Sequence, residues 1–256
     1  MSSSAALQGL KIGCVQYLNA KPLIHGYDGR VIFDHPSRLA TALSRGQLDV
    51  ALVPVYEMFG SGGYRAVDGV SISSFGPVFS VFLAYRGELG ELKEISLDPF
   101  SRTSSHLLRC ILQEFHGFQP AFVPEAKGGA RLLIGNQAIA FRQEHGDDYK
   151  FLDLGEEWKK QTSLPFVFAL WLIRPEVANL GAIADALRVL KRGGLANLDQ
   201  IAQEEVGFDA HFCERYLRHH IRYDLGEPEK RGIAKFHELL LKHGLAAPNV
   251  GSVDFV

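Results

Sequence analysis

The sequence is poor in cysteine, methionine and tryptophan, which number three, two and two among its 256 residues. The cysteines Cys14, Cys110 and Cys213 lie far apart and form no CxxC pair, which argues against a disulfide framework and a zinc knuckle. A formal net charge of −2 at pH 7 indicates no nucleic-acid or membrane-surface partner. The sequence has no run of about 18 apolar residues, so no membrane-spanning helix is expected.

Signatures of several other functions are also missing. The N-terminal stretch MSSSAALQGL has no basic region and no long apolar core, so we expect no signal peptide and a cytoplasmic location. No GxGxxG or P-loop pattern indicates a nucleotide site. HFCERYLRHH is rich in potential metal ligands, but it has no i, i+4 histidine pair, and His219 and His220 point about 100° apart on a helix. We predict a solvated helix face there, and neither metal nor cofactor.

The rest of the composition, 46% hydrophobic and 22% charged, is ordinary for a globular protein of one large or two modest domains. Strand and helix patterns alternate twice along it. The first series has strands at 10–17, 31–35 and 48–59 and helices at 19–27 and 36–47. The second has strands at 94–98, 120–125 and 149–154 and a helix at 104–117, and after a strand at 164–174 the chain reads as helical to its end. This order predicts an α/β protein with parallel strands.

Two long apolar strands, 78–86 and 165–173, flank the second series and are suited to cross between two lobes as a hinge. We therefore predict a discontinuous first lobe, 1–84 plus 171–256, whose C-terminal part is helical. The second lobe is then 85–170. Open α/β sheets bind ligands beyond the carboxyl ends of their strands, which here face the cleft between the lobes.

Serine and threonine gather where the second-lobe helix is expected to start. SRTSS, residues 101–105, places hydroxyls and free backbone N–H groups at a helix N-terminus, which favours a carboxylate. Ser101, Thr103 and Ser104 are the candidate contacts. The alternative is that these side chains simply cap the helix.

Asn19, in YLNAKPL, stands where the first strand gives way to a short helix with Pro22 in its first turn. The asparagine is a candidate N-cap, and it is also placed to orient a ligand from the cleft.

Two further polar stretches are expected at the junctions between the lobes. Ser74 and Ser80 flank the Gly-Pro turn of SSFGPVFS, where they serve either as turn residues or as substrate-binding hydroxyls. At the second junction, Thr162, Ser163 and Leu164 either close the pocket floor or form a buried turn.

Five segments taken together resemble the chorismate dehydratase family, which opens the futalosine route to menaquinone. They are KIGCVQYLNAKPL, GQLDVALVPVYE, SISSFGPVFSVFL, DPFSRTSSHLLR and EEWKKQTSLPFVFALW, and they span residues 11 to about 172. A sister family that makes dihydroxynaphthoate opens with a different Ser/Cys/Pro-rich element, which this sequence lacks. The resemblance implies a periplasmic-binding-protein type 2 fold used as a cofactor-free enzyme on the dicarboxylate chorismate. It also implies a catalytic asparagine at Asn19 and a catalytic-site hydroxyl at Ser80.

The sequence departs from the family pattern at one place. The family usually carries a Gly-Asp pair before the Ala-Leu of the second lobe, whereas this sequence has Gly135 and Asn136. Asparagine keeps a hydrogen-bond acceptor and loses the charge.

The matched motifs YLNA, GPVFS and SRTS contain no histidine, lysine or carboxylate to serve as a base. This favours proton removal by the substrate's own enolpyruvyl carboxylate, which resembles the mechanism proposed for the family. His25 and Glu57 lie near strand ends and are the alternative protein bases; as loop or helix residues they are otherwise expected to be solvated.

Two non-enzymatic functions use the same cleft. One is a solute-binding protein for a small carboxylate, which the absence of a signal peptide disfavours. The other is a ligand-sensing domain of a regulator, and no helix-turn-helix segment precedes residue 10. The sequence leaves the oligomeric state open.

Overall fold

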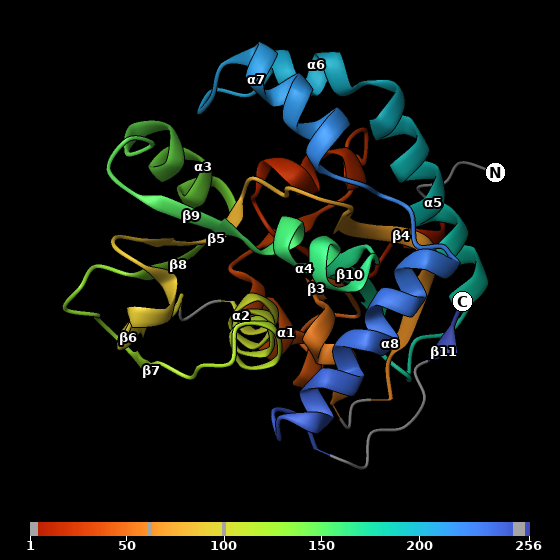
Figure 1. Ribbon diagram of the computed structural model, residues 1–256. Helices are drawn as coiled ribbons and strands as arrows, with labels where there is room; N and C mark the ends of the chain where they lie inside the picture. The colour runs from red at the N-terminus through yellow and green to blue at the C-terminus, as the bar shows by residue number, and fades with distance from the viewer. Residues whose placement is uncertain (1–4, 61–62, 99–100, 248–253) are drawn as a thin grey trace.

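The computed structural model describes residues 5–60, 63–98, 101–247 and 254–256. Its first sheet has six strands in the order β11-β4-β10-β3-β1-β2 (Figure 1). These strands are β1 (Ile12–Cys14), β2 (Val31–Phe33), β3 (Val50–Pro54), β4 (Arg65–Ser74), β10 (Phe166–Ile173) and β11 (Asp254–Phe255). β1 pairs in parallel with both β2 and β3, as the alternating pattern predicts. β10 runs antiparallel to β3 and β4.

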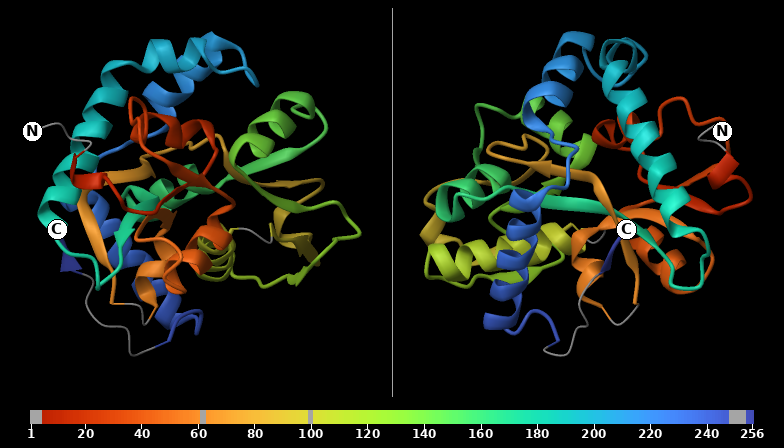
Figure 2. Two further views of the ribbon diagram at one scale, coloured as in Figure 1. Left: turned by 180° about the vertical axis from the view of Figure 1, so that it is seen from behind. Right: turned by 90° about the vertical axis from the view of Figure 1, so that its right-hand side faces the viewer.

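The second sheet has five strands in the order β7-β6-β8-β5-β9. They are β5 (Val81–Tyr85), β6 (Glu94–Ser96), β7 (Ala121–Val123), β8 (Arg131–Ile134) and β9 (Lys150–Asp153). β6 is parallel to β7 and β8, whereas β5 is antiparallel to β8 and β9. Figures 1 and 2 show the two sheets side by side, as the two-lobe α/β fold requires.

The chain passes twice between the sheets. β5 lies wholly in the five-stranded sheet and β10 wholly in the six-stranded sheet. The passages are therefore the short segments before these strands, 75–80 and 163–165, rather than the strands themselves. The lobe boundaries 1–84 plus 171–256 and 85–170 stay a prediction.

The helices connect and cover the two sheets. The α-helices are α1 (Pro36–Ser44), α2 (Arg102–Phe115), α3 (Gly135–Glu144), α4 (Leu154–Thr162), α5 (Leu180–Ala196), α6 (Leu198–Gln203), α7 (Ala210–Arg215) and α8 (Glu227–Lys242). The 3₁₀ helices are η1 (Ala5–Leu7), η2 (Leu18–Leu23), η3 (Val55–Phe59) and η4 (Leu89–Glu91), and η5 (Tyr216–His220) is a π-helix. α5 and α8 lie alongside the six-stranded sheet in Figures 1 and 2.

The core is organised around β10. Seven of its eight residues are buried, so the strand is covered on both faces, which explains its continuous apolar run FVFALWLI. Trp171 on this strand and Trp158 on α4 are among the largest fully buried side chains. Burying this strand holds in place the adjoining strand ends that open toward the cleft.

The C-terminal segment differs from the prediction in two respects. It is not helical to its end, because β11 adds a strand to the six-stranded sheet. HFCERYLRHH is not a fully solvated face either, because Phe212, Cys213 and Tyr216 are buried. The periodicity of a short helix does not reveal which face a distant loop will cover.

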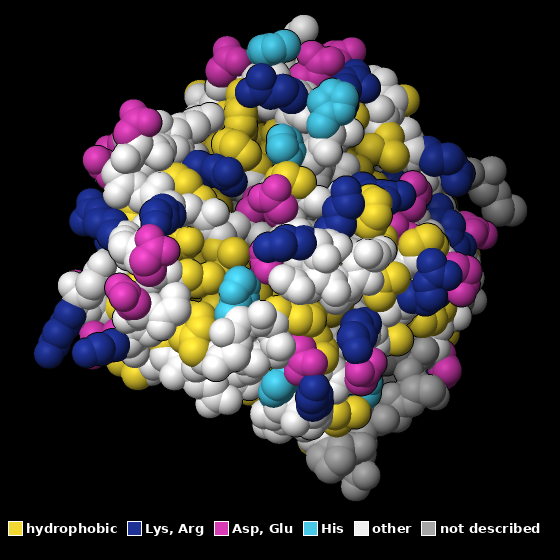
Figure 3. All heavy atoms as spheres, viewed as in Figure 1, with side chains coloured by type: hydrophobic (Ala, Val, Ile, Leu, Met, Phe, Trp, Pro, Cys, Tyr) yellow, Lys and Arg dark blue, Asp and Glu magenta, His cyan; other side chains and the backbone are white. Residues whose placement is uncertain are grey.

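The sequence predicts no metal site and no membrane-spanning helix. Within the described residues no group of three or more His, Cys, Asp or Glu side chains could hold a metal ion, and none of their helices is long and apolar enough to cross a membrane. On the face shown in Figure 3, basic and acidic side chains are interspersed rather than gathered by sign.

Candidate active site

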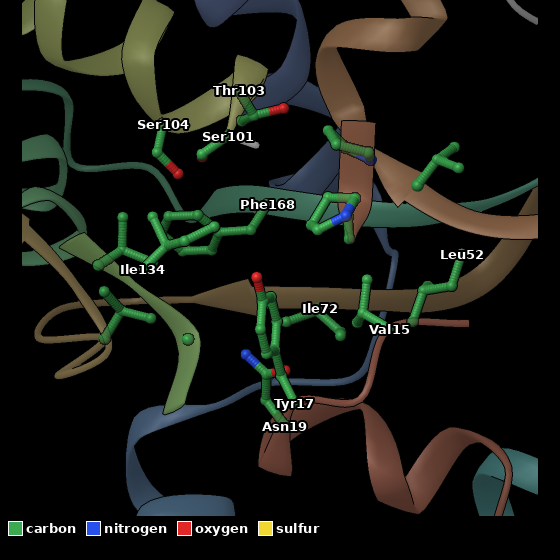
Figure 4. A pocket seen from close by; sticks show the side chains of 17 residues that line it. Val15, Tyr17, Asn19, Leu52, Ile72, Ser101, Thr103, Ser104, Ile134 and Phe168 are labelled. Atoms are coloured by element: carbon green, nitrogen blue, oxygen red, sulfur yellow. The ribbon is translucent and has the colours of Figure 1, made fainter. Parts of the chain in front are cut away.

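A pocket lies between the two sheets, with about 550 Å³ of space free of atoms when its opening to solvent is counted. Leu52 and Ile72 line it from the six-stranded sheet, with Val15 directly after β1, and Val81 and Ile134 line it from the five-stranded sheet. Figure 4 shows Tyr17 and Asn19 on one side and Ser101, Thr103 and Ser104 on the other. Among the described residues that line the pocket there is no Asp, Glu, Lys, Arg or His, so a charged ligand must be held by neutral dipoles.

The N-terminus of α2 supplies such dipoles. Ser101 occupies the N-cap position but makes no capping hydrogen bond with its side chain. The first intrahelical bond runs from the Ser105 N–H to the Ser101 carbonyl, so the preceding N–H groups of the first turn have no acceptor in the helix. Ser101, Thr103 and Ser104 are buried and line the pocket. Free N–H groups and hydroxyls at a helix N-terminus form a site for a carboxylate.

Asn19 faces the pocket from η2 and is not the N-cap that the sequence suggests. Tyr17 takes the N-cap position, without a side-chain capping bond, and Asn19 lies inside the helix. Only 8% of Asn19 is exposed, and its Oδ1 has no hydrogen-bond partner among the described residues. A buried amide oxygen without a partner is costly unless a ligand donates to it. Asn19 therefore offers the pocket an acceptor.

Tyr17 is the titratable side chain in the pocket lining. Its hydroxyl points into the pocket in Figure 4. Burial, with a smaller contribution from the charge of Asp98, raises the pKa of Tyr17 to about 12. The phenol is therefore protonated near neutral pH and can donate a hydrogen bond, but it is not a base.

Gly135 and Asn136, at the start of α3, contact η2 from the five-stranded sheet. The ring of Tyr17 packs so closely on Gly135 that a Cβ there would meet ring carbons at 2.7 to 2.9 Å. Asn136 Oδ1 accepts a hydrogen bond from the Leu18 N–H at 2.9 Å. Aspartate would offer the same kind of acceptor oxygen at this position. The Asn136 oxygen thus joins the two sides of the pocket, and this hydrogen bond needs no charge.

Ser80 and Ser74 are buried but lie outside the pocket lining. The Tyr216 hydroxyl donates to Ser80 Oγ at 2.7 Å, and the Ser80 carbonyl accepts from the Gly135 N–H at 2.8 Å. Ser74 Oγ has no partner among the described residues and faces Gly155. The structure brings Ser80 to the back of the pocket and leaves Ser74 beside α4.

Asp153 holds the loop that precedes Ser80. Its carboxylate accepts the N–H groups of Val78 and Phe79 at 3.0 and 2.8 Å, and it also caps α4. Phe79 has φ 67°, a left-handed conformation that is unfavourable for a bulky residue. Burial raises the pKa of Asp153, and its hydrogen bonds and Arg142 offset part of that rise. This carboxylate is therefore committed to loop structure and is not free to act as a base.

Thr162, Ser163 and Leu164 are not brought to the pocket. Thr162 Oγ1 donates to the Trp158 carbonyl at 2.7 Å and accepts from the Leu164 N–H at 3.2 Å. Ser163 closes α4 in a left-handed conformation. The three residues form the turn that leads from α4 into β10.

The two alternative bases also lie outside the pocket lining. His25 follows η2 and is partly exposed. Glu57 pairs with Arg102, with Nη1 3.4 Å from Oε1. Burial raises the pKa of Glu57, and Arg102 offsets part of the rise. Neither side chain faces the space where a ligand would react.

Tyr216 is the site residue that the sequence does not reveal. It is fully buried, its hydroxyl donates to Ser80 Oγ, and the Asn19 side chain contributes to lowering the pKa of that hydroxyl. Its position 136 residues after Ser80, inside a charged stretch, carries no local signal of this contact.

Solved structures share this two-lobe arrangement. A protein of Archaeoglobus fulgidus is similar with a TM-score of 0.72 at 16% identity, covering 92% of this chain and 98% of that chain. The ligand-binding component of an ABC-type import system from Staphylococcus aureus is similar with a TM-score of 0.63 at 14% identity, covering 94% of each chain. The fold and the pocket between two sheets thus define a protein of periplasmic-binding-protein-like fold, as expected from the sequence.

Sequence comparisons define the family within that class. A chorismate dehydratase of Thermus thermophilus is 31% identical over 261 residues, which cover 90% of this chain and 94% of that protein. Residues 10–242 match the family described as menaquinone biosynthesis. The chain belongs to the menaquinone biosynthesis family, which confirms the resemblance carried by its motifs.

Proposed function

We propose that this protein is a chorismate dehydratase of menaquinone biosynthesis, a hydro-lyase that converts chorismate into 3-[(1-carboxyvinyl)oxy]benzoate and water without a cofactor. The family and the Thermus relative support this function. A cytoplasmic location is part of the proposal, and it includes no nucleic-acid or membrane partner.

The chemistry demands little more than positioning. Chorismate carries two carboxylates, a ring hydroxyl and an enolpyruvyl ether. The C–H bond at the ether-bearing ring carbon breaks, the C–O bond of the hydroxyl breaks, and the ring becomes aromatic. Because aromatisation drives the reaction, the enzyme mainly has to hold the dianion in a reactive pose and stabilise developing charge.

The pocket residues divide these tasks. In our proposal the N-terminus of α2, with Ser101, Thr103 and Ser104, holds one carboxylate. Asn19 Oδ1 accepts a hydrogen bond from the leaving hydroxyl and fixes its orientation. Ser80 supports the site from behind. In our proposal Ser74, Thr162, Ser163 and Leu164 make no substrate contact, and their positions outside the pocket lining support this.

The enolpyruvyl carboxylate is proposed to be the base. It takes the proton from the ether-bearing carbon and returns it to the departing hydroxyl, so that water leaves and the carboxylate is regenerated. The observation that carries this step is that the described pocket lining holds no Asp, Glu, Lys or His, and that its tyrosine stays protonated.

Incubation with chorismate tests the proposed function directly. The diene absorbance should disappear, and a product one water lighter should be found by mass. If the spectrum stays unchanged while binding saturates, the protein captures a carboxylate without converting it, and the enzyme function is wrong.

Substitution of the alternative bases tests the substrate-assisted step. His25→Asn and Glu57→Gln should each lower turnover about tenfold or less, because a true general base contributes ~10² to 10⁴-fold. Steady-state kinetics on chorismate measure this. If either variant abolishes turnover with ligand affinity intact, that side chain is the base.

A further inference from the structure

Tyr216 contacts a predicted catalytic side chain that belongs to a distant part of the chain. Its hydroxyl donates to Ser80 Oγ at 2.7 Å. The Ser80 carbonyl in turn accepts a hydrogen bond at 2.8 Å from the N–H of Gly135, which lines the pocket. The phenol therefore bears on the pocket through Ser80.

The surroundings of Tyr216 hold its ring rigidly. The residue begins the π-helix η5, a rare conformation that is frequent at functional sites. The ring of Phe212 stacks on it, with centroids 5.9 Å apart and planes 13° apart. His220, one turn on, lies against the same ring at 6.2 Å and pairs through Nδ1 with the Pro77 carbonyl at 2.9 Å. Helices α5, α6 and α7 form an arch at the top of Figure 1, and the π-helix that follows α7 is thereby attached to the loop that carries Ser80.

The hydroxyl stays a donor over the working pH range. Burial raises the pKa of Tyr216 well above that of an ordinary phenol, and hydrogen bonds to Ser80 and Asn19 offset only part of the rise. The phenol is absent from the pocket lining, so it does not contact a ligand there.

We propose that Tyr216 is a positioning residue for the dehydration, which acts by fixing the Ser80 side chain at the back of the pocket. The assignment rests on the proposed function. Without the phenol hydroxyl, the Ser80 hydroxyl loses its hydrogen-bond partner and is free to rotate. Productive orientation then becomes less frequent, while the carboxylate site at α2 is unchanged.

Tyr216→Phe tests this assignment on the full chain. We expect kcat to fall about tenfold, the size associated with one lost hydrogen bond, and KM to stay within about twofold. Tyr223→Phe is the matched control, because Tyr223 is also buried but its hydroxyl has no partner among the described residues. It should leave kcat unchanged. A kcat for Tyr216→Phe equal to that of the unmodified protein would overturn the proposal.

A double-mutant cycle separates positioning from a general structural effect. If Tyr216 acts through Ser80, Tyr216→Phe should cost nothing further in a Ser80→Ala background, whereas additive losses would overturn the proposal. Assays with enzyme in excess and product quantified by mass spectrometry keep the slow turnover of the double variant measurable. If the unmodified protein does not dehydrate chorismate at all, the proposed function fails, and this outcome is distinct from normal turnover by Tyr216→Phe.

Discussion

Asn19→Ala is expected to lower turnover of chorismate on the order of 10²-fold, the loss typical of one oriented hydrogen bond to a reacting group. The amide oxygen is buried at the pocket and has no partner among the described residues, so its hydrogen-bonding capacity is available to the substrate. The residue is not the N-cap of η2, so no helix cap is lost. The melting temperature should fall by less than about 4 °C, the effect of at most one lost hydrogen bond.

Kinetics on chorismate and thermal unfolding of the same preparation measure these two effects separately. Asn197→Ala is the control, because Asn197 donates one amide hydrogen bond to the Gly193 carbonyl and is not part of the pocket lining. It should show a similar change in melting temperature with unchanged kcat. Near-normal turnover in Asn19→Ala would remove Asn19 from the site.

Gly135→Ala is expected to lower kcat/KM by about 10²-fold, because a displacement of about 1 Å in a substrate-positioning group has effects of this size. The added Cβ would meet the Tyr17 ring at 2.7 to 2.9 Å, so the ring must move. Tyr17 lines the pocket, and the Gly135 N–H also donates to the Ser80 carbonyl. The substitution therefore disturbs both sides of the pocket at once.

Gly117→Ala is a control that separates the steric effect of the added Cβ from the strain of a left-handed backbone. Gly135 has φ +64° and Gly117 has φ +71°, so alanine at either position costs about 1–2 kcal/mol of conformational energy. A Cβ at Gly117 would meet nothing within 4 Å. Gly117→Ala should lose stability and keep its kcat/KM. If the two variants lose kcat/KM equally, or neither loses it, the contact of Gly135 with Tyr17 has no part in the reaction.

The sequence by itself determined the class of fold. The order of strands and helices at 10–59 predicts the parallel pairing of β1, β2 and β3. A crossover helix returns the chain to the end of the sheet where the previous strand began, so the next strand runs in the same direction. The uninterrupted apolar run at 164–174 predicts a long strand, which is found as β10. The serines and threonine of 101–105 predict a helix N-terminus, which is found at the pocket. These features are local or periodic, so a short window of sequence contains them.

Only the tertiary structure decided how the site is assembled. The bond from Leu18 N–H to Asn136 spans 118 residues, and the bond from Tyr216 to Ser80 spans 136. Tyr216 lies in a stretch whose charges suggest a solvated helix, yet the fold buries it against Ser80. Thr162 and its neighbours have the composition of a pocket floor, yet their hydrogen bonds close a turn. Periodicity reports which face of an element is apolar, but the partner of each polar atom depends on how distant elements pack, and no local pattern contains that packing.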